Sequence, residues 1–155
     1  MIRRANKNDI PRINELLRQV CSVHAQGRPD IFIDGTRKYS DEELAALFED
    51  DSRPVFVYTD DNDTALAHAF CLYEEIKGVS NMHDMKTLYI DDICVDETAR
   101  GQHIATALYE YVKQFAKDND CYRITLNVWE INPTARKFYE KMGLLPLKTT
   151  MEAIL

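Results

Sequence analysis

The sequence lacks the features that would place it in a special structural class. Its 155 residues contain no internal repeat, no low-complexity tract and no shift in composition that would mark a domain boundary. Apolar residues make up 45% and charged residues 29%, as in ordinary globular proteins, so we expect a single domain over residues 1–155. No apolar run reaches the length of a membrane span and the N-terminus has no apolar signal core, which predicts a cytoplasmic protein without a membrane partner.

Paired cysteines and an excess of positive charge are also missing. The four cysteines contain no Cys-x-x-Cys pair, so we expect free thiols in a reducing compartment: Cys21, Cys71, Cys94 and Cys121. The formal net charge of −7 argues against nucleic acid as a partner and favours a cationic or amine ligand. The acidic run at 60–63 lacks the Gly and the distant Glu of a calcium loop, so we expect no metal site.

The most informative stretch begins with a strand at Leu88–Val95 and continues into an amphipathic helix. Apolar residues recur there at three- and four-residue spacing: Ile104, Ala107, Leu108, Tyr111, Val112 and Phe115. The residues 100–103, Arg-Gly-Gln-His, therefore stand at the N-terminus of this helix. Because the first N–H groups of a helix have no internal partner and carry the positive end of its dipole, this turn is suited to a phosphate or pyrophosphate.

A second strand and a short helix follow. Residues 124–129 are predicted to form the strand, and Asn132 and Pro133 open the helix as N-cap and first helical residue. Gly143 ends it. The strand-turn-helix unit is thus followed by another strand and helix, in an order that carries a family resemblance.

The series R-G-Q-H-I-A at residues 100–105 and N-P-T-A-R-K-F-Y-E-K-M-G-L at residues 132–144 resemble the GCN5-related N-acetyltransferases, the GNAT family. In that family a Q/R-x-x-G-x-G/A turn holds the coenzyme A pyrophosphate, and an N-x-x-A-x-x-x-Y helix supplies an Asn near the pantetheine and a Tyr near the thiol. Arg100 and Ala105 fit the first and last positions of the turn, whereas His103 replaces the central Gly. His is among the few non-glycine residues enriched at positive φ, so it is compatible with the turn.

The resemblance implies acetyl-CoA as co-substrate and a set of residues that bind it. Backbone groups of residues 93–95 are expected to run beside the pantetheine like an added strand. Asn132 is expected to bond the same arm, although its role as N-cap explains it equally well. The full set implied for coenzyme A is Ile93, Cys94, Val95, Arg100, Gly101, Gln102, His103, Ile104, Ala105, Thr106, Asn127, Asn132, Ala135 and Phe138.

The resemblance places Tyr139 at the position of the acid that hydrogen-bonds the leaving thiolate, although a Phe-Tyr pair in an amphipathic helix also packs well without catalysis. For the base we choose between Asp91 and Asp92. In a regular strand their side chains point to opposite faces, so one at most addresses a given site. The run Y-I-D-D-I-C-V is similar to a strand of spermidine/spermine acetyltransferases, where an acid at the position of Asp91 serves the acceptor amine. Either acid could instead pair with a basic neighbour.

The remaining sequence predicts helices and strands that pack around this unit, and a loop that lies beside the acceptor. These are a strand at residues 1–5, a helix capped by Asn8 or Asp9 and ending near His24, a helix after Ser40, a hairpin over residues 54–76, and a C-terminal strand at residues 148–155. By resemblance the loop after the first helix borders the acceptor, which makes His24, Arg28 and Asp30 candidates for substrate contact. They could equally anchor a surface loop.

We therefore expect an α/β fold with a mixed, partly antiparallel sheet that is splayed at the coenzyme A site and flanked by helices. The expected activity is acetyl transfer from acetyl-CoA to an amine of a small molecule, polyamine-like or another primary amine, by direct attack in a ternary complex. One alternative acceptor is a protein or peptide N-terminus. A different class, a non-catalytic coenzyme A sensor or partner subunit, stays open, as does a homodimer formed through the C-terminal strand.

Overall fold

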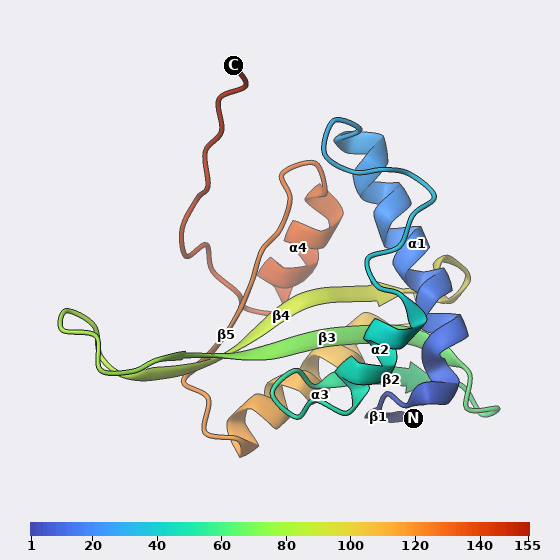
Figure 1. The fold of residues 1–155 in the computed structure, drawn as a ribbon, viewed down its shortest axis with the longest axis horizontal. Helices are drawn as coiled ribbons and strands as arrows, with labels where there is room; N and C mark the ends of the chain where they lie inside the picture. Colours follow the sequence, from blue (N-terminus) through green and yellow to red (C-terminus); the bar gives the residue numbers. More distant parts are fainter.

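A five-stranded sheet forms the centre of the computed structural model, which describes residues 1–155 (Figure 1). Its spatial order follows the sequence: β1 (Ile2–Arg4), β2 (Val55–Thr59), β3 (Ala65–Ile76), β4 (Met85–Val95) and β5 (Arg123–Leu126). The first four strands pair antiparallel, and β5 pairs parallel to β4. The expected α/β fold with a mixed sheet is confirmed.

Helices cover both faces of the sheet. One apolar cluster joins the sheet to α1 (Ile10–Gly27) and α2 (Asp41–Phe48), and includes Ile13, Leu44 and Phe70. A second cluster joins the opposite face to α3 (Ile104–Asp118), and α4 (Pro133–Lys141) packs against its margin. Short 3-10 turns at Lys7–Asp9 and Glu97–Ala99 precede α1 and α3. The buried clusters fix α1 and α4 on either side of the end of β4.

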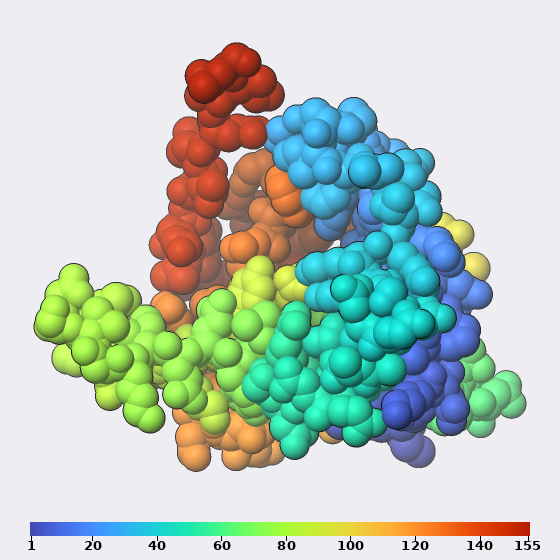
Figure 2. Space-filling model, viewed as in Figure 1, coloured from blue at the N-terminus to red at the C-terminus, as the bar shows by residue number.

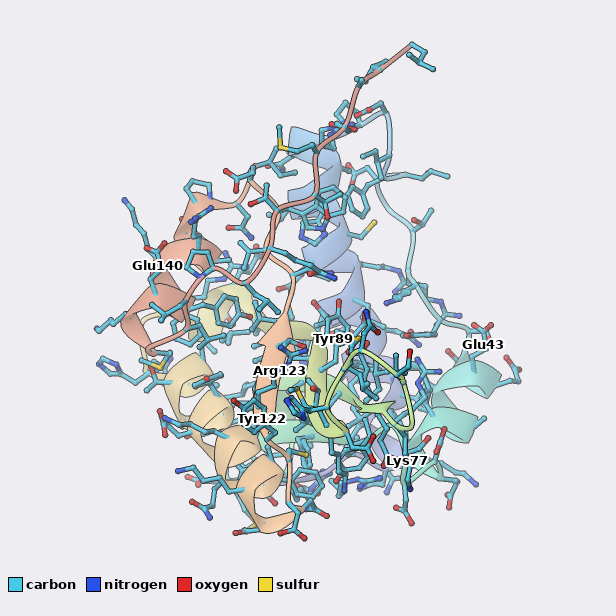
Figure 3. All side chains as sticks on the ribbon, turned by 90° about the vertical axis from the view of Figure 1, so that its left-hand side faces the viewer. Glu43, Lys77, Tyr89, Tyr122, Arg123 and Glu140 are labelled. Atoms are coloured by element: carbon cyan, nitrogen blue, oxygen red, sulfur yellow. The ribbon has the colours of Figure 1, made fainter.

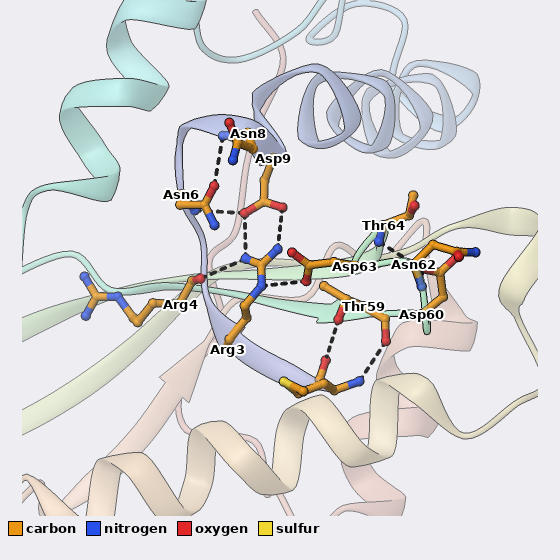
Figure 4. Close-up of polar contacts among 11 residues, drawn as sticks. Arg3, Arg4, Asn6, Asn8, Asp9, Thr59, Asp60, Asn62, Asp63 and Thr64 are labelled. Atoms are coloured by element: carbon orange, nitrogen blue, oxygen red, sulfur yellow. Dashed lines mark hydrogen bonds and ion pairs between the residues drawn. The ribbon is translucent and has the colours of Figure 1, made fainter.

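Asp9 is the N-cap residue of α1, one of the two that the sequence offered, but its side chain makes no capping bond to that helix. Asn6, rather than Asn8 or Asp9, accepts from a backbone N–H, and it opens the 3-10 turn that leads into α1. The Asp9 carboxylate instead accepts from the backbone N–H of Asn6 and binds the Arg3 guanidinium at 2.8 and 3.0 Å (Figure 4). The guanidinium also binds Asp63, so this cluster ties β1 to the start of α1 and to the β2–β3 turn.

The sheet opens between β4 and β5. These strands pair only from Thr87 to Ile90 on β4 and from Arg123 to Leu126 on β5, and beyond that point they separate. The second predicted strand is therefore shorter than residues 124–129, because residues 127–129 leave the sheet and turn toward α4. Figure 3 labels Tyr89 and Arg123 on the paired part of the two strands. The separation is the expected splay.

The predicted C-terminal strand does not form. Residues 145–155 make no backbone hydrogen bond, and the segment extends away from the body (Figures 1 and 2). One contact ties it to the domain, an ion pair between Glu152 and Arg28. Its apolar side chains are exposed, among them Leu145, Leu147, Met151, Ile154 and Leu155. We call residues 145–155 the C-terminal arm.

No helix of the structure is both long and apolar enough to cross a bilayer.

Candidate active site

The turn before α3 presents a row of free backbone donors. N–H groups of residues 101–106 donate to no protein acceptor, and the first helical bond runs from Ala107 to His103. His103 is the N-cap and has the left-handed conformation, φ 60° and ψ 16°, while Gly101 has φ 80°. His103 thus adopts the left-handed conformation that the sequence analysis described as compatible with this residue. Buried Ile104 anchors the turn, so its donors are fixed in place and suited to an anion.

The turn is also tied to the open part of β4. Residues 93–95 pair with β3 on one side, whereas their other side lies beyond the last pair with β5. Arg100 Nε donates to the carbonyl of Val95 across this edge, at 3.4 Å. The side chains of Arg100, Gln102 and His103 are exposed. An extended ligand at this edge therefore meets strand backbone at one end and the free N–H groups of the turn at the other.

A β-bulge in β4 brings Asp91 and Asp92 to the same face. Asp92 pairs with Phe70 and Ile90 pairs with Cys71, so Asp91 is an extra residue in β4. The residues of β4 that face α3 show the effect of the bulge. They are Leu88 and Ile90 before it and Ile93 and Val95 after it, so the alternation of faces is shifted by one residue. The expectation that the two carboxylates point to opposite faces is wrong, since it assumed a regular strand. Both address the side covered by α1 and α2.

The two carboxylates have different partners. Asp91 forms an ion pair with Lys38, from the loop before α2. Partial burial lowers the pKa of the Lys38 ammonium, but the hydrogen bond and charge of Asp91, together with Tyr39, outweigh it and raise the pKa overall. Asp92 Oδ2 lies 2.6 Å from Nε2 of His68, which is fully buried and whose Nδ1 has no partner. Because an ionised carboxylate can only accept a hydrogen bond, Nε2 of His68 is the donor to Asp92.

Tyr139 lies in α4, the helix that follows the separated end of β5. Its ring contacts those of Tyr109 and Phe138, with centroids 6.5 and 5.1 Å away. Burial raises its pKa well above the ordinary value near 10, and the negative charge of Asp92 raises it further. The phenol therefore stays protonated at any physiological pH and can donate a hydrogen bond.

The remaining residues predicted for coenzyme A lie around α4. The side chain of Asn132 accepts from the backbone N–H of Ala135 at 3.1 Å, so its role as N-cap is confirmed. Asn127 donates to the hydroxyl of Tyr89 at 3.2 Å. Phe138 packs at the margin of the core.

Among the three candidates for substrate contact, His24 lies in the last turn of α1 and forms no ion pair. Burial lowers the pKa of His24, and the charge of Asp92 partly opposes that effect. Arg28 is occupied by Asp30 and Glu152, so these residues join the loop to the C-terminal arm.

Sequence reasoning did not single out His68, Lys38, Phe32 or Trp129. His68 stands alone in an apolar strand, A-L-A-H-A-F, a pattern that signals a buried and partnered histidine. The ring of His24 lies 4.9 Å from Phe32 and 6.2 Å from Trp129, and Phe32 and Trp129 meet edge to face at 5.2 Å. We call His24, Phe32 and Trp129 the aromatic cluster. Two surface hollows of about 250 and 270 Å³ lie elsewhere, at the end of the β3–β4 hairpin and beside α2.

The comparisons agree with this geometry. The family model described as "Acetyltransferase (GNAT) family" matches residues 18–144. The comparison with curated proteins gave no match. Among solved structures, a mutant of the BH1408 protein from Bacillus halodurans is 30% identical, with a TM-score of 0.95 over 100% of this chain and 99% of that one.

Two more distant structures share the fold. An acetyltransferase from Trypanosoma brucei is 18% identical, with a TM-score of 0.73 over 100% of this chain and 99% of that one. An aminoglycoside acetyltransferase from an uncultured soil metagenomic sample, in complex with sisomicin, is 17% identical, with a TM-score of 0.73 over 100% and 94% of the two chains. The family model covers most of the chain, and the splayed sheet and the donor-rich turn are those that the motifs predict. This chain belongs to the GNAT acetyltransferase family.

Proposed function

We propose that this protein transfers an acetyl group from acetyl-CoA to the amine nitrogen of a small molecule, by direct attack in a ternary complex. The observation that carries the proposal is the arrangement of Asp92 and Tyr139. Asp92 stands on the part of β4 that has separated from β5, its charge acts on the buried phenol of Tyr139, and the turn with free N–H groups follows β4 in the chain. Amide formation at a thioester needs a proton acceptor for the amine and a donor for the departing sulfur.

The fit to coenzyme A rests on the polar atoms that have no partner within the protein. The N–H groups of residues 101–106 suit the pyrophosphate, and the open edge of residues 93–95 suits the pantetheine amides. When bound, acetyl-CoA supplies the thioester whose acetyl group is transferred. We assign no metal to the reaction.

Asp92 is the proposed base. A primary amine has a pKa near 10.4, so its deprotonation at pH 7 costs about 4–5 kcal/mol. Because His68 occupies Oδ2 of Asp92, the other oxygen, Oδ1, is free to take that proton directly or through a water. Asp91 is already neutralised by Lys38 and is the weaker candidate.

Tyr139 is the proposed donor to the leaving sulfur. As the N–C bond forms and the C–S bond breaks, the electron pair of the broken bond goes to sulfur. A neutral phenol stabilises that charge by a hydrogen bond without losing its proton. Positioning of the amine against the acetyl group contributes in addition.

The test is the release of free coenzyme A thiol with a panel of amines: polyamines, aminoglycosides, amino acids, aryl-alkylamines and short peptides. Tyr139→Phe and Asp92→Asn should each lower kcat by about 10- to 100-fold, since a hydrogen bond to a charged group contributes about 1.5–3 kcal/mol. Asp91→Asn is the matched control and should lose much less.

Calorimetry with coenzyme A separates binding from chemistry, because all three variants should retain affinity. Unchanged rates in Tyr139→Phe and Asp92→Asn would contradict the assigned roles. Tight coenzyme A binding without turnover of any amine would favour the sensor reading instead.

A further inference from the structure

The aromatic cluster stands next to the proposed base. His24 comes from α1, Phe32 from the loop that follows it, and Trp129 from the loop between β5 and α4. Their ring centroids lie 4.9–6.2 Å apart, so the three rings touch and form one continuous apolar surface. The helix α1, which carries His24, packs against the end of β4, which carries Asp92: Cys94 Sγ lies 3.5 Å from the carbonyl oxygen of Leu16. In agreement with this packing, the charge of Asp92 acts on the pKa of His24.

Exposed apolar residues lie within two positions of Phe32 and Trp129 in the chain. Ile31 and Ile33 flank Phe32 in the chain and are 45% and 74% exposed, and Ile131 follows Trp129 at 38%. Trp129 itself is 40% exposed. Figure 2 shows a hollow between the light-blue end of α1 and the C-terminal arm in red. Large apolar side chains gathered beside a reactive carboxylate are typical of a ligand-binding surface.

One carboxylate at this site has no Lys or Arg partner and can therefore bind one cation of a ligand. Asp91 is paired with Lys38, and Asp30 and Glu152 both bind Arg28. Asp92 is the carboxylate whose protein partner is a histidine rather than a Lys or Arg. A polyamine needs a carboxylate for each of its ammonium groups, because a desolvated and unpaired cation is costly.

We propose that the acceptor is a monoamine with an aromatic or bulky apolar body, such as an aryl-alkylamine. This inference rests on the proposed transferase function and names its substrate class. The amine nitrogen binds at Asp92, and the apolar body packs on the rings of Phe32 and Trp129. The acceptor is therefore selected by one charge and one apolar surface, and not by a series of charges.

The experiment compares kcat/KM at saturating acetyl-CoA for four amines: 2-phenylethylamine, propylamine, 1,3-diaminopropane and spermidine. We expect 2-phenylethylamine to exceed each of the others by about tenfold or more, as burial of an aromatic side chain contributes about 1.5–3 kcal/mol. Trp129→Ala should remove most of this preference by raising KM for 2-phenylethylamine, so that the ratio of its kcat/KM to that of propylamine falls toward one.

A matched control is Tyr122→Ala, which removes an aromatic side chain that is 76% exposed and lies outside the cluster. It should leave the ratio between the amines unchanged. Preference for spermidine or the diamine, or a ratio unaltered by Trp129→Ala, would overturn this inference while leaving the transferase intact. A peptide with N-terminal Phe that is preferred over 2-phenylethylamine would overturn the assignment to a small molecule. Turnover of no amine, with coenzyme A bound, would overturn the proposed function itself.

Discussion

Gly27 and Ile131 are packed so closely that no side chain fits between them. A Cβ on Gly27 would lie 2.5 Å from Cδ1 of Ile131 and 2.9 Å from its Cβ. Gly27 is the last residue of α1, and Ile131 lies two residues after Trp129 in the loop before α4. This contact therefore sets the distance between the two sides of the proposed acceptor site.

Gly27→Ala should displace the loop that carries Ile131 and Trp129, because a Cβ cannot approach another carbon to 2.5 Å. We expect KM for the amine to rise by several-fold, with the affinity for coenzyme A unchanged, as measured by steady-state kinetics and calorimetry. Adding Ile131→Ala removes Cδ1 and Cγ1, at 2.5 and 3.2 Å, but keeps Cβ at 2.9 Å, so it should restore only part of the loss. Ile131→Ala alone is the control, and an equal KM in all four proteins would contradict the role of this contact.

His103→Gly should stabilise the protein. His103 has φ 60°, and a non-glycine residue in the left-handed region costs about 1–2 kcal/mol, of which the greater freedom of Gly in the unfolded chain cancels a part. The net gain should be about 0.5–1 kcal/mol in the free energy of unfolding, measured with denaturant.

His103→Ala keeps the Cβ in the same strained conformation and should show no such gain. Coenzyme A affinity should survive both changes, because the backbone N–H groups are the proposed ligands. A destabilised His103→Gly would show that the imidazole contributes more than the strain costs.

His24 should make the protein less stable in mild acid. Burial lowers its pKa below the ordinary value of 6.5, so the unfolded chain binds a proton there more readily than the folded one. The contribution of His24 to the free energy of unfolding is fully present above about pH 6.5, the pKa in the unfolded chain. It is lost as the pH falls from there toward the lower pKa of the folded state. His24→Gln should therefore lose less stability than the wild type between about pH 7.5 and pH 5. The measurement is denaturant unfolding across that range, and parallel curves for the two proteins would contradict it.

We propose that the C-terminal arm pairs with a second copy of the chain. Its residues Leu145, Leu147, Met151 and Leu155 alternate, as on one face of a strand, and are exposed by 63% or more. The outer edge of β5 has no partner in the sheet. If two copies related by a two-fold axis exchanged their arms, the apolar side chains of each arm and the open edge of each β5 would both be covered.

Sedimentation velocity should show a dimer for the full chain and a monomer for residues 1–144. Met151→Lys is a milder test and should weaken the dimer. A monomeric full chain at micromolar concentration would contradict the proposal.

The local elements were predictable because their signals are local. The spacing of apolar residues in α3, the cap at Asn132 and the capping box that begins at Ser40 follow from neighbours within a few residues. The order of the two coenzyme A motifs was sufficient to indicate the family and with it the splayed sheet.

The tertiary structure decided what depends on distant contacts. The bulge that turns Asp91 and Asp92 to one face arises from the pairing of β4 with β3, and no residue in β4 signals it. His68 meets Asp92 across that same pairing, and the aromatic cluster joins three segments that are more than a hundred residues apart at its ends. A sequence determines helices and turns through interactions between near neighbours, whereas strand register and the meeting of loops are determined only when the whole chain packs.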